Sequence, residues 1–139
     1  MTQRQVAEAA RTLREFVIAM MRTAPASDLS RTAAGTLSVL QLDGPQRITA
    51  LADREAITQP AMTGLIQRLE TGGLVVRQAD PVDGRACLIA ITREGREALE
   101  RRRLQHDEVI ASRIAKLSPK QLSLLRAALP AISTLSENS

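Results

Sequence analysis

The sequence predicts a mainly α-helical domain that carries one small antiparallel hairpin. Apolar residues recur at the three- and four-residue spacing of an amphipathic helix through most of the chain. Two short runs of β-forming residues, 74–78 and 86–91, flank a segment containing Pro81 and the Asp83-Gly84 pair, which favour turns. The chain has 139 residues, of which 44% are hydrophobic and 24% charged, and this balance fits one ordinary globular domain. Because one Phe is its sole aromatic residue, the core must be aliphatic.

Capping residues and helix breakers place the boundaries of the helices. Ser30 is a suitable N-cap, Pro60 is tolerated only in a first turn, and Ser118 opens a capping box. Pro130 is expected to kink the last helix near its end, and residues 133–139 are expected to fray. The expected helices run to about Arg22, from Ser30 to Gly44, over 48–55, from Thr58 or Gln59 to Gly73, over 93–116 and from Ser118 onward.

The third and fourth expected helices, followed by the hairpin, have the order of a winged helix-turn-helix. At about 100° per residue, the fourth helix has one apolar face and an opposite face that is small, polar and free of acidic residues. Such a face suits base edges in a DNA groove, and Arg68 on the flank of the helix can reach a phosphate. The apolar face carries Met62, Leu65, Ile66 and Leu69, and the polar face carries Pro60, Thr63, Gly64, Gln67 and Thr71.

Composition excludes several other classes of function. Cys87 is the single cysteine and His106 the single histidine, so neither an internal disulfide nor a metal site can be assembled. The near absence of aromatic residues excludes stacking platforms for single-stranded nucleic acid. No nucleophile stands beside a base and no glycine-rich phosphate loop is present, so the sequence predicts neither an enzyme nor a cofactor. It shows no membrane-spanning run and no signal peptide, which predicts a cytoplasmic location.

The charge balance alone gives weak support for a nucleic-acid partner. The formal net charge is +4, but between residues 45 and 97 seven arginines are balanced by seven acidic residues. The placement of individual charges must therefore decide the kind of partner.

Several short motifs resemble the MarR family of transcriptional regulators. They are Ile48-Thr49-Ala50-Leu51-Ala52, Gln59-Pro60-Ala61-Met62-Thr63, Arg68-Leu69-Glu70, Gly73-Leu74-Val75-Val76-Arg77, and Asp80-Pro81-Val82-Asp83-Gly84-Arg85 leading to Ile91-Thr92. The resemblance covers nearly the whole chain and implies one MarR-type domain over residues 1–139. It implies a winged-helix lobe over 30–97 and dimerisation helices over 1–29 and 98–139. The chain departs from the family at Gly64, where an arginine usually stands on the outer face of the recognition helix.

The fourth helix is expected to contact duplex DNA in the major groove. The amides of Gln59 and Gln67 can each offer a donor and an acceptor to adenine, and Thr63 can bond a base or touch a thymine methyl group. Pro60 and Gly64 allow the backbone to approach closely, although Gly64 can instead be explained as a close contact between helices.

The wing is expected to contact the neighbouring minor groove. Arg85 would enter that groove or bind a phosphate, and Asp83 would orient its guanidinium by a charge-assisted bond. An ordinary ion pair within the turn is the alternative explanation for these two residues. Arg77 at the base of the wing resembles a family residue that ties the wing to the helices.

The resemblance implies a homodimeric, ligand-responsive transcription factor, expected to be a repressor, that binds a pseudo-palindromic DNA operator. The implied ligand class is a small aromatic or phenolic anion. Phe16, Met20 and Met21 can line its pocket, with a role in the hydrophobic core as the alternative. The competing function is a winged-helix module that binds protein and not DNA. An apolar outer face on the fourth helix would favour that module, and Thr63 and Gln67 argue against it.

Overall fold

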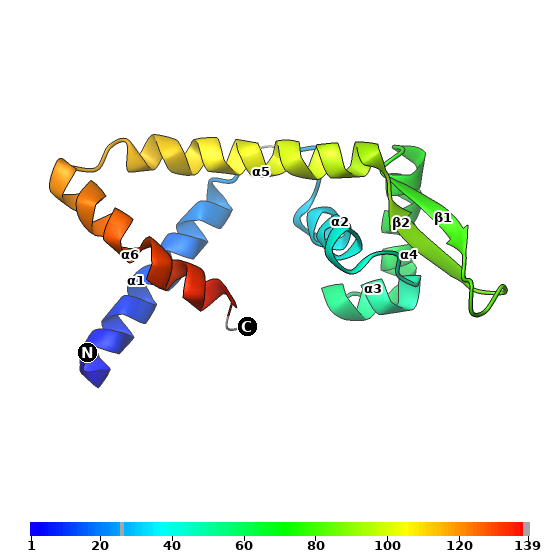
Figure 1. Cartoon of the computed structure of the whole chain (residues 1–139), viewed down its shortest axis with the longest axis horizontal. Helices are drawn as coiled ribbons and strands as arrows, with labels where there is room; N and C mark the ends of the chain where they lie inside the picture. Colours follow the sequence, from blue (N-terminus) through cyan, green and yellow to red (C-terminus); the bar gives the residue numbers. More distant parts are fainter. Residues whose placement is uncertain (26, 138–139) are drawn as a thin grey trace. The chain divides into compact units, whose positions relative to one another are not determined.

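The computed structural model describes residues 1–25 and 27–137, which form two compact units. The winged unit spans Ala26–Leu104, and the terminal unit combines Met1–Pro25 with Gln105–Ser139. Figure 1 shows the order of the elements along the chain. They are α1 (Gln3–Arg22), α2 (Arg31–Asp43), α3 (Ile48–Glu55), α4 (Gln59–Thr71), β1 (Val75–Ala79), β2 (Cys87–Ile91), α5 (Arg93–Ile114) and α6 (Pro119–Glu137).

The local signals read from the sequence act as expected at several helix ends. Ser30 Oγ accepts a hydrogen bond from the Ala33 N–H at 3.1 Å, and Thr58 Oγ1 accepts one from the Ala61 N–H at 3.3 Å. Gly73 follows α4 with a positive φ of 76°. These contacts confirm the predicted starts of α2 and α4 and the stop after α4.

The turn between α3 and α4 was not foreseen in detail. Ala56 has φ 53° and ψ 42°, the left-handed conformation that usually falls to glycine. Its N–H donates to the Asp53 carbonyl at 3.2 Å, and the next N–H, of Ile57, donates to the Ala52 carbonyl at 3.1 Å. These bonds end α3 tightly, so that only three residues separate it from α4.

The wing is a two-stranded antiparallel sheet in which Val75 pairs with Ile91 and Ala79 with Cys87. An isolated bridge adds Gln46 beside Ile89, so the segment before α3 extends the sheet by one residue pair. The strands begin one residue later than the sequence predicts.

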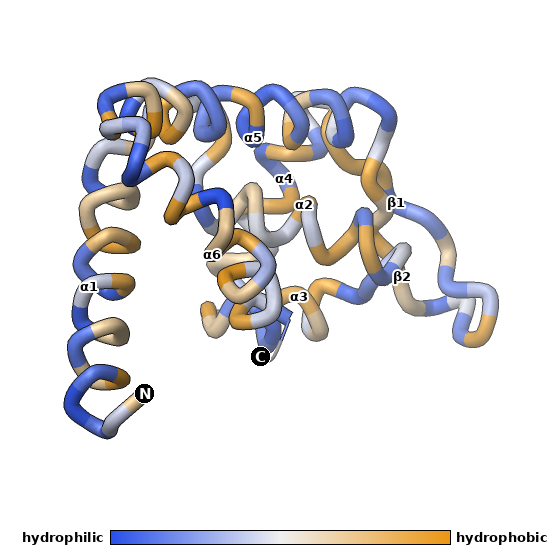
Figure 2. Tube along the Cα trace, turned by 60° about the vertical axis from the view of Figure 1, so that its left-hand side comes forward, coloured by the Kyte–Doolittle hydropathy of each residue, from blue (hydrophilic) through white to orange (hydrophobic). Residues whose placement is uncertain are grey.

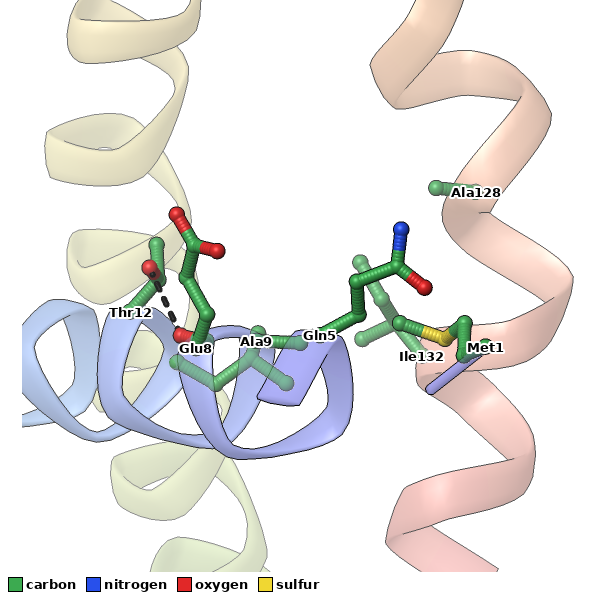
Figure 3. Close-up of a pocket in the computed structure, with 8 residues that line it drawn as sticks. Met1, Gln5, Glu8, Ala9, Thr12, Ala128 and Ile132 are labelled. Atoms are coloured by element: carbon green, nitrogen blue, oxygen red, sulfur yellow. Dashed lines mark hydrogen bonds between the residues drawn. The ribbon is translucent and has the colours of Figure 1, made fainter. Parts of the chain in front are cut away.

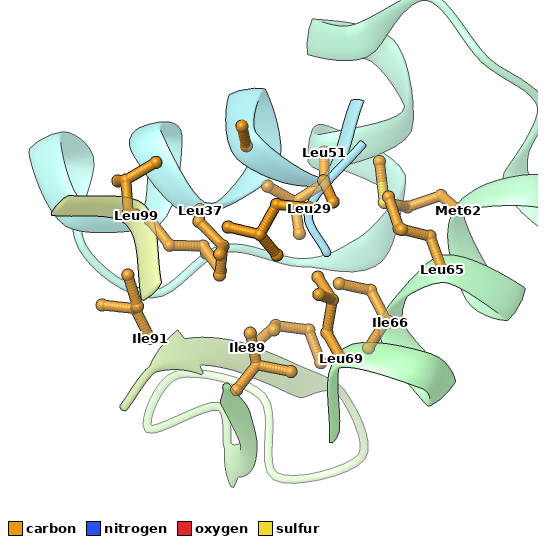
Figure 4. Close-up of a cluster of buried hydrophobic side chains, with 14 of the residues drawn as sticks. Leu29, Leu37, Leu51, Met62, Leu65, Ile66, Leu69, Ile89, Ile91 and Leu99 are labelled. Carbon is orange, nitrogen blue, oxygen red and sulfur yellow. The ribbon is translucent and has the colours of Figure 1, made fainter. Parts of the chain in front are cut away.

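An aliphatic core holds the winged unit together. Leu37, Leu51, Met62, Ile66 and Ile89 are fully buried, and Figure 4 shows side chains from α2, α3, α4 and β2 meeting in one cluster. The mainly helical fold with a small antiparallel wing confirms the predicted fold class.

The terminal unit has a different character, because neither α1 nor α6 contains a buried residue. Hydrophobic residues gather along one side of α1 (Figure 2). Arg113 Nη2 on α5 donates to Thr23 Oγ1 at 2.7 Å, which joins the end of α1 to the end of α5.

The C-terminal helix corrects one expectation. Residues 133–139 were expected to fray, but α6 runs through Pro130 and continues to Glu137. Hydroxyl groups bond within it, such as Ser136 Oγ, which donates to the Ile132 carbonyl at 3.2 Å. Residues 138 and 139 lie outside the described part of the chain.

Candidate nucleic-acid interface

The recognition helix α4 is fixed by its apolar face. Met62 and Ile66 are completely buried, and Leu65 and Leu69 nearly so. Figure 4 shows these four side chains in the hydrophobic cluster. Since one face is committed to the core, the opposite face must point outward. Gln59, Pro60, Gln67 and Arg68 are accordingly exposed, and Thr63 and Gly64 are half-buried.

Hydroxyl groups on this outer face are already used by the helix itself. Thr63 Oγ1 donates to the Gln59 carbonyl at 3.0 Å, and Thr71 Oγ1 donates to the Gln67 carbonyl at 2.9 Å. The hydroxyl of Thr63 therefore offers acceptor lone pairs and a methyl group, but no proton, to a ligand. From the sequence, Thr63 can act as a donor or an acceptor, and in the structure only the acceptor role remains.

Gly64 is not a contact between helices. An ideal Cβ built there would meet one atom within 4 Å, Arg68 Nη1 at 3.5 Å, once the backbone of α4 itself is set aside. The alternative explanation from the sequence is therefore wrong. The guanidinium of Arg68 lies beside Gly64, one turn closer to the helix N-terminus than its own Cα. An open cavity of about 600 Å³ lies here, lined by Gly64, Gln67, Arg68, Glu70 and Thr71.

Arg77 joins the wing to the recognition helix. Its Nε donates to Glu70 Oε1 at 3.3 Å, a bond between β1 and the end of α4. This hydrogen bond raises the pKa of Arg77 above its ordinary value. Arg77 also offsets the negative charge of Glu70, the carboxylate at the edge of the outer face of α4.

Asp83 and Arg85 lie at the tip of the wing, but their contact differs from the expected one. Asp83 Oδ1 accepts the backbone N–H of Arg85 at 3.1 Å, and no ion pair joins the two side chains within the described residues. A carboxylate that bonds the N–H two residues onward shapes the turn, as aspartate commonly does. The Asp83 carboxylate therefore binds the backbone, and Arg85 is exposed with no contact between its guanidinium and that carboxylate.

Sequence reasoning missed the contact that holds the base of the wing. Asp80 is 8% exposed, and its Oδ2 accepts from both Nε and Nη2 of Arg47, at 3.0 and 2.6 Å. Its Oδ1 accepts the N–H groups of Val82 and Asp83, at 2.9 and 3.4 Å. The hydrogen bond from Arg47, followed by that from Val82, holds the pKa of Asp80 below its ordinary value. One carboxylate thus links the start of α3 to the turn that carries Asp83 and Arg85.

Replacing Asp80 with alanine is expected to lower the melting temperature at neutral pH, because Arg47 and two backbone N–H groups lose their acceptor. Asp80 has a lowered pKa in the folded state, so its contribution is present above the unfolded-state pKa of about 3.9. That contribution is lost as the pH falls through the folded-state pKa. Melting curves between pH 3 and pH 7 should show the difference between wild type and variant shrinking at low pH.

The matched control is Asp43→Ala, because Asp43 pairs with Arg54 at 3.0 Å in a more exposed setting, with 42% of its side chain accessible against 9% for Asp80. The control should change the melting temperature little. Equal losses for the two variants would contradict an anchoring role for Asp80.

The two arginines Arg68 and Arg85 differ from the others at this interface. Neither has a carboxylate within 4 Å among the described residues, whereas Arg77 and Arg47 are both paired. A polar helix face without a free carboxylate, bordered by unpaired guanidinium groups, is matched to a polyanion.

The other chemical classes gain no support from the described residues. No group of His, Cys, Asp and Glu side chains there is arranged to hold a metal ion. None of the helices found there is long and apolar enough to cross a membrane.

The predicted pocket residues on α1 lie at the surface. Phe16 and Met21 are exposed and Met20 is half-buried. None of the three belongs to the hydrophobic core of the single chain, since α1 contributes no buried residue to it.

The helix-turn-helix, the outward face of α4 and the wing together define a winged-helix DNA-binding protein. The sequence model of the MarR family matches residues 27–86. The chain is 34% identical over 104 residues to "Uncharacterized HTH-type transcriptional regulator Mb0904" of Mycobacterium bovis, covering 75% of this chain and 73% of that protein. It is 32% identical over 75 residues to the "Homoprotocatechuate degradative operon repressor" of Escherichia coli, covering 54% and 51%. The crystal structure of the transcriptional regulator Tm0710 from Thermotoga maritima superposes with a TM-score of 0.77 at 25% identity, covering 94% and 95%.

This chain belongs to the MarR family. It is a transcriptional regulator with a DNA-binding fold, and not an enzyme.

Proposed function

We propose that the chain binds a pseudo-palindromic DNA operator as a homodimer and represses transcription from it. The observation that carries this proposal is the outer face of α4, which is polar, has its nearby carboxylate paired to Arg77, and is bordered by the unpaired Arg68. In this arrangement α4 lies in the major groove and Arg85 reaches the adjacent minor groove.

Each residue of the proposed interface has a distinct part. The amides of Gln59 and Gln67 bond adenine edges, and Thr63 accepts a hydrogen bond from a base or touches a thymine methyl group. Pro60 and Gly64 keep the helix surface low enough for close approach. In the wing, Arg77 and Asp83 hold the hairpin in position and Arg85 binds the DNA.

The terminal unit supports the proposed homodimer. Its two outer helices present apolar side chains that the chain itself leaves uncovered, and an open cavity of about 530 Å³ lies between α1 and α6. Figure 3 shows Gln5 and Ala9 on α1, Ala128 and Ile132 on α6, and the Met1 side chain beside Ile132. Exposed apolar surface of this extent marks an interface, and a second copy with the same surface is the simplest occupant. The exposed residues are Val6, Leu13, Phe16, Val17, Ile18, Met21, Leu122, Leu124, Leu129, Ile132 and Leu135.

Regulation by a small aromatic or phenolic anion forms the finer part of the proposal. The Escherichia coli relative is named as a repressor of a degradative operon. Phe16, Met20 and Met21 remain one proposed pocket. A second candidate is a cavity of about 480 Å³ in the winged unit, lined by apolar residues such as Leu65 and Leu69 together with Asp28, Arg68 and Arg101. Titrating benzoate and phenol derivatives into a preformed DNA complex tests this part, with release of the duplex as the supporting result.

The test of the function is selection from a pool of random duplexes by the intact chain. We expect an enriched pseudo-palindrome with half-sites about 10 base pairs apart, centre to centre. Mapping of bound DNA in cells should recover the same sequence upstream of genes whose transcription rises when the regulator is removed. If no sequence is enriched in either experiment, the protein-binding winged-helix module becomes the better explanation.

Arg85→Ala is expected to weaken binding to specific and random duplexes together. A permanent cation at the wing tip releases counterions from most sequences, so its loss should reduce the slope of log K against log salt by about one unit. Fluorescence anisotropy over a range of salt concentrations measures this slope. The control is Arg93→Ala, which removes another exposed charge, one that is paired with Glu97 on α5. A loss confined to the specific duplex would show that Arg85 reads bases and does not act through charge.

A further inference from the structure

The direction of the Arg68 side chain changes what the recognition helix can read. Its Cα lies in the second half of α4, away from the N-terminal residues that usually enter a major groove. Side chains on a helix lean toward the N-terminus. Because Gly64 has no side chain, the Arg68 guanidinium can lie against the preceding turn, and its Nη1 stands 3.5 Å from where a Gly64 Cβ would be.

The guanidinium of Arg68 also forms no ion pair within the described residues. Glu70 shares the cavity on this face, but its carboxylate is engaged by Arg77. No existing ion pair therefore has to be broken before the Arg68 guanidinium binds a ligand. Pairing of Glu70 by Arg77 removes the group that would otherwise attract Arg68 away from the groove.

The two threonine hydroxyls on this face have no free proton, so its donors are the Gln59 and Gln67 amides and the Arg68 guanidinium. The Thr63 hydroxyl proton is bonded to the Gln59 carbonyl, and the Thr71 hydroxyl proton is bonded to the Gln67 carbonyl. Neutral amides on this face suit adenine, whereas two acceptors side by side, O6 and N7 of guanine, are matched by the fork of a guanidinium.

We infer that Arg68 reads a guanine in the major groove, through the space that Gly64 leaves on α4. This rests on the proposed DNA-binding function and makes one guanine in each half-site a determinant of specificity. It replaces the phosphate contact that the sequence suggests for Arg68. Gly64 leaves room for this guanidinium: a Cβ there would already touch Arg68 Nη1 at 3.5 Å, so a side chain longer than that of alanine would compete for the same space.

The experiment compares wild type, Arg68→Ala and Arg68→Lys on the duplex selected by the wild-type chain. Each guanine of the half-site is replaced in turn by 7-deazaguanine, which lacks the N7 acceptor and keeps the base pair. For wild type we expect one position per half-site at which the replacement weakens binding roughly tenfold to 100-fold. Arg68→Ala should lose that penalty, and Arg68→Lys should show a smaller one than wild type. Arg68→Lys should keep its affinity for random duplexes, because it retains the charge but not the two-pronged donor geometry.

Three outcomes separate the inference from the function on which it rests. Loss of the 7-deazaguanine penalty in Arg68→Ala, at the position where wild type shows it, supports the inference. If Arg68→Ala weakens all duplexes equally and the penalty persists, Arg68 contacts phosphate, and the inference fails while DNA binding stands. If wild type prefers no duplex, the proposed function itself fails. Circular dichroism of the variants should match wild type, because Arg68 is exposed.

Discussion

Replacing both Leu129 and Ile132 with glutamate is expected to yield a monomer that binds the full operator roughly 100- to 10,000-fold more weakly than wild type. Both residues are apolar and exposed, at 52% and 38%, and both lie on α6, where the chain buries no residue. In a dimer, binding of one half-site holds the second recognition helix near the other half-site. A monomer loses that advantage without losing any contact made by a single α4.

Sedimentation at micromolar concentration and anisotropy with one-half-site and two-half-site duplexes provide the two measurements. The control is Leu42→Glu, the same kind of change at a residue 80% exposed on α2 in the winged unit. It should leave the sedimentation coefficient unchanged. A double variant that still sediments as a dimer would place the interface elsewhere, and a monomeric wild type would contradict the proposed homodimer.

The fold could be predicted closely because its signals are local. Ile48–Glu55 forms α3 over the predicted residues, and the capping box expected at Ser118 is present, with the Gln121 N–H donating to Ser118 Oγ at 3.2 Å. Helix caps and apolar periodicity depend on residues a few positions apart, which a sequence displays directly. The predicted fraying is wrong for residues 133–137, which continue α6 as far as Glu137.

The candidate site could be predicted only in part. Periodicity identifies the outer face of α4 correctly, because the Cβ directions of a helix follow from its geometry. It cannot place the end of a long side chain: periodicity puts Arg68 on the flank of α4, whereas its guanidinium lies beside Gly64. The bond between Arg47 and Asp80 joins residues 33 positions apart, and no local pattern links them. Asp80 carried a signal in its turn-forming Asp-Pro sequence, but Arg47 carried none.

Packing between α5 and the wing depends on a glycine that sequence reasoning passed over. A Cβ at Gly95 would collide with the Leu74 carbonyl oxygen and lie 2.8 Å from Ile91 Cγ1. Thr92 completes the same junction: its Oγ1 donates to the Gly73 carbonyl at 2.6 Å and accepts the Gly95 N–H at 3.0 Å, while its own N–H donates to Leu74. The first turn of α5 is thus fixed against the residues that connect α4 to β1.

Gly95→Ala is therefore expected to destabilise the protein by about 1 to 3 kcal/mol, the range typical of overpacking a filled site. Helix propensity alone predicts the opposite sign, since alanine is favoured over glycine inside a helix by about 1 kcal/mol. The backbone atoms of Leu74 cannot rotate away as a flexible side chain would, so relief requires moving the start of the wing relative to α4.

Urea denaturation measures the loss of stability in Gly95→Ala. The control is Gly84→Ala, because no atom lies within 4 Å of a Cβ built at that wing residue, and it should be nearly neutral. A Gly95→Ala protein as stable as wild type would show that the junction yields easily and that the wing is not held by this contact.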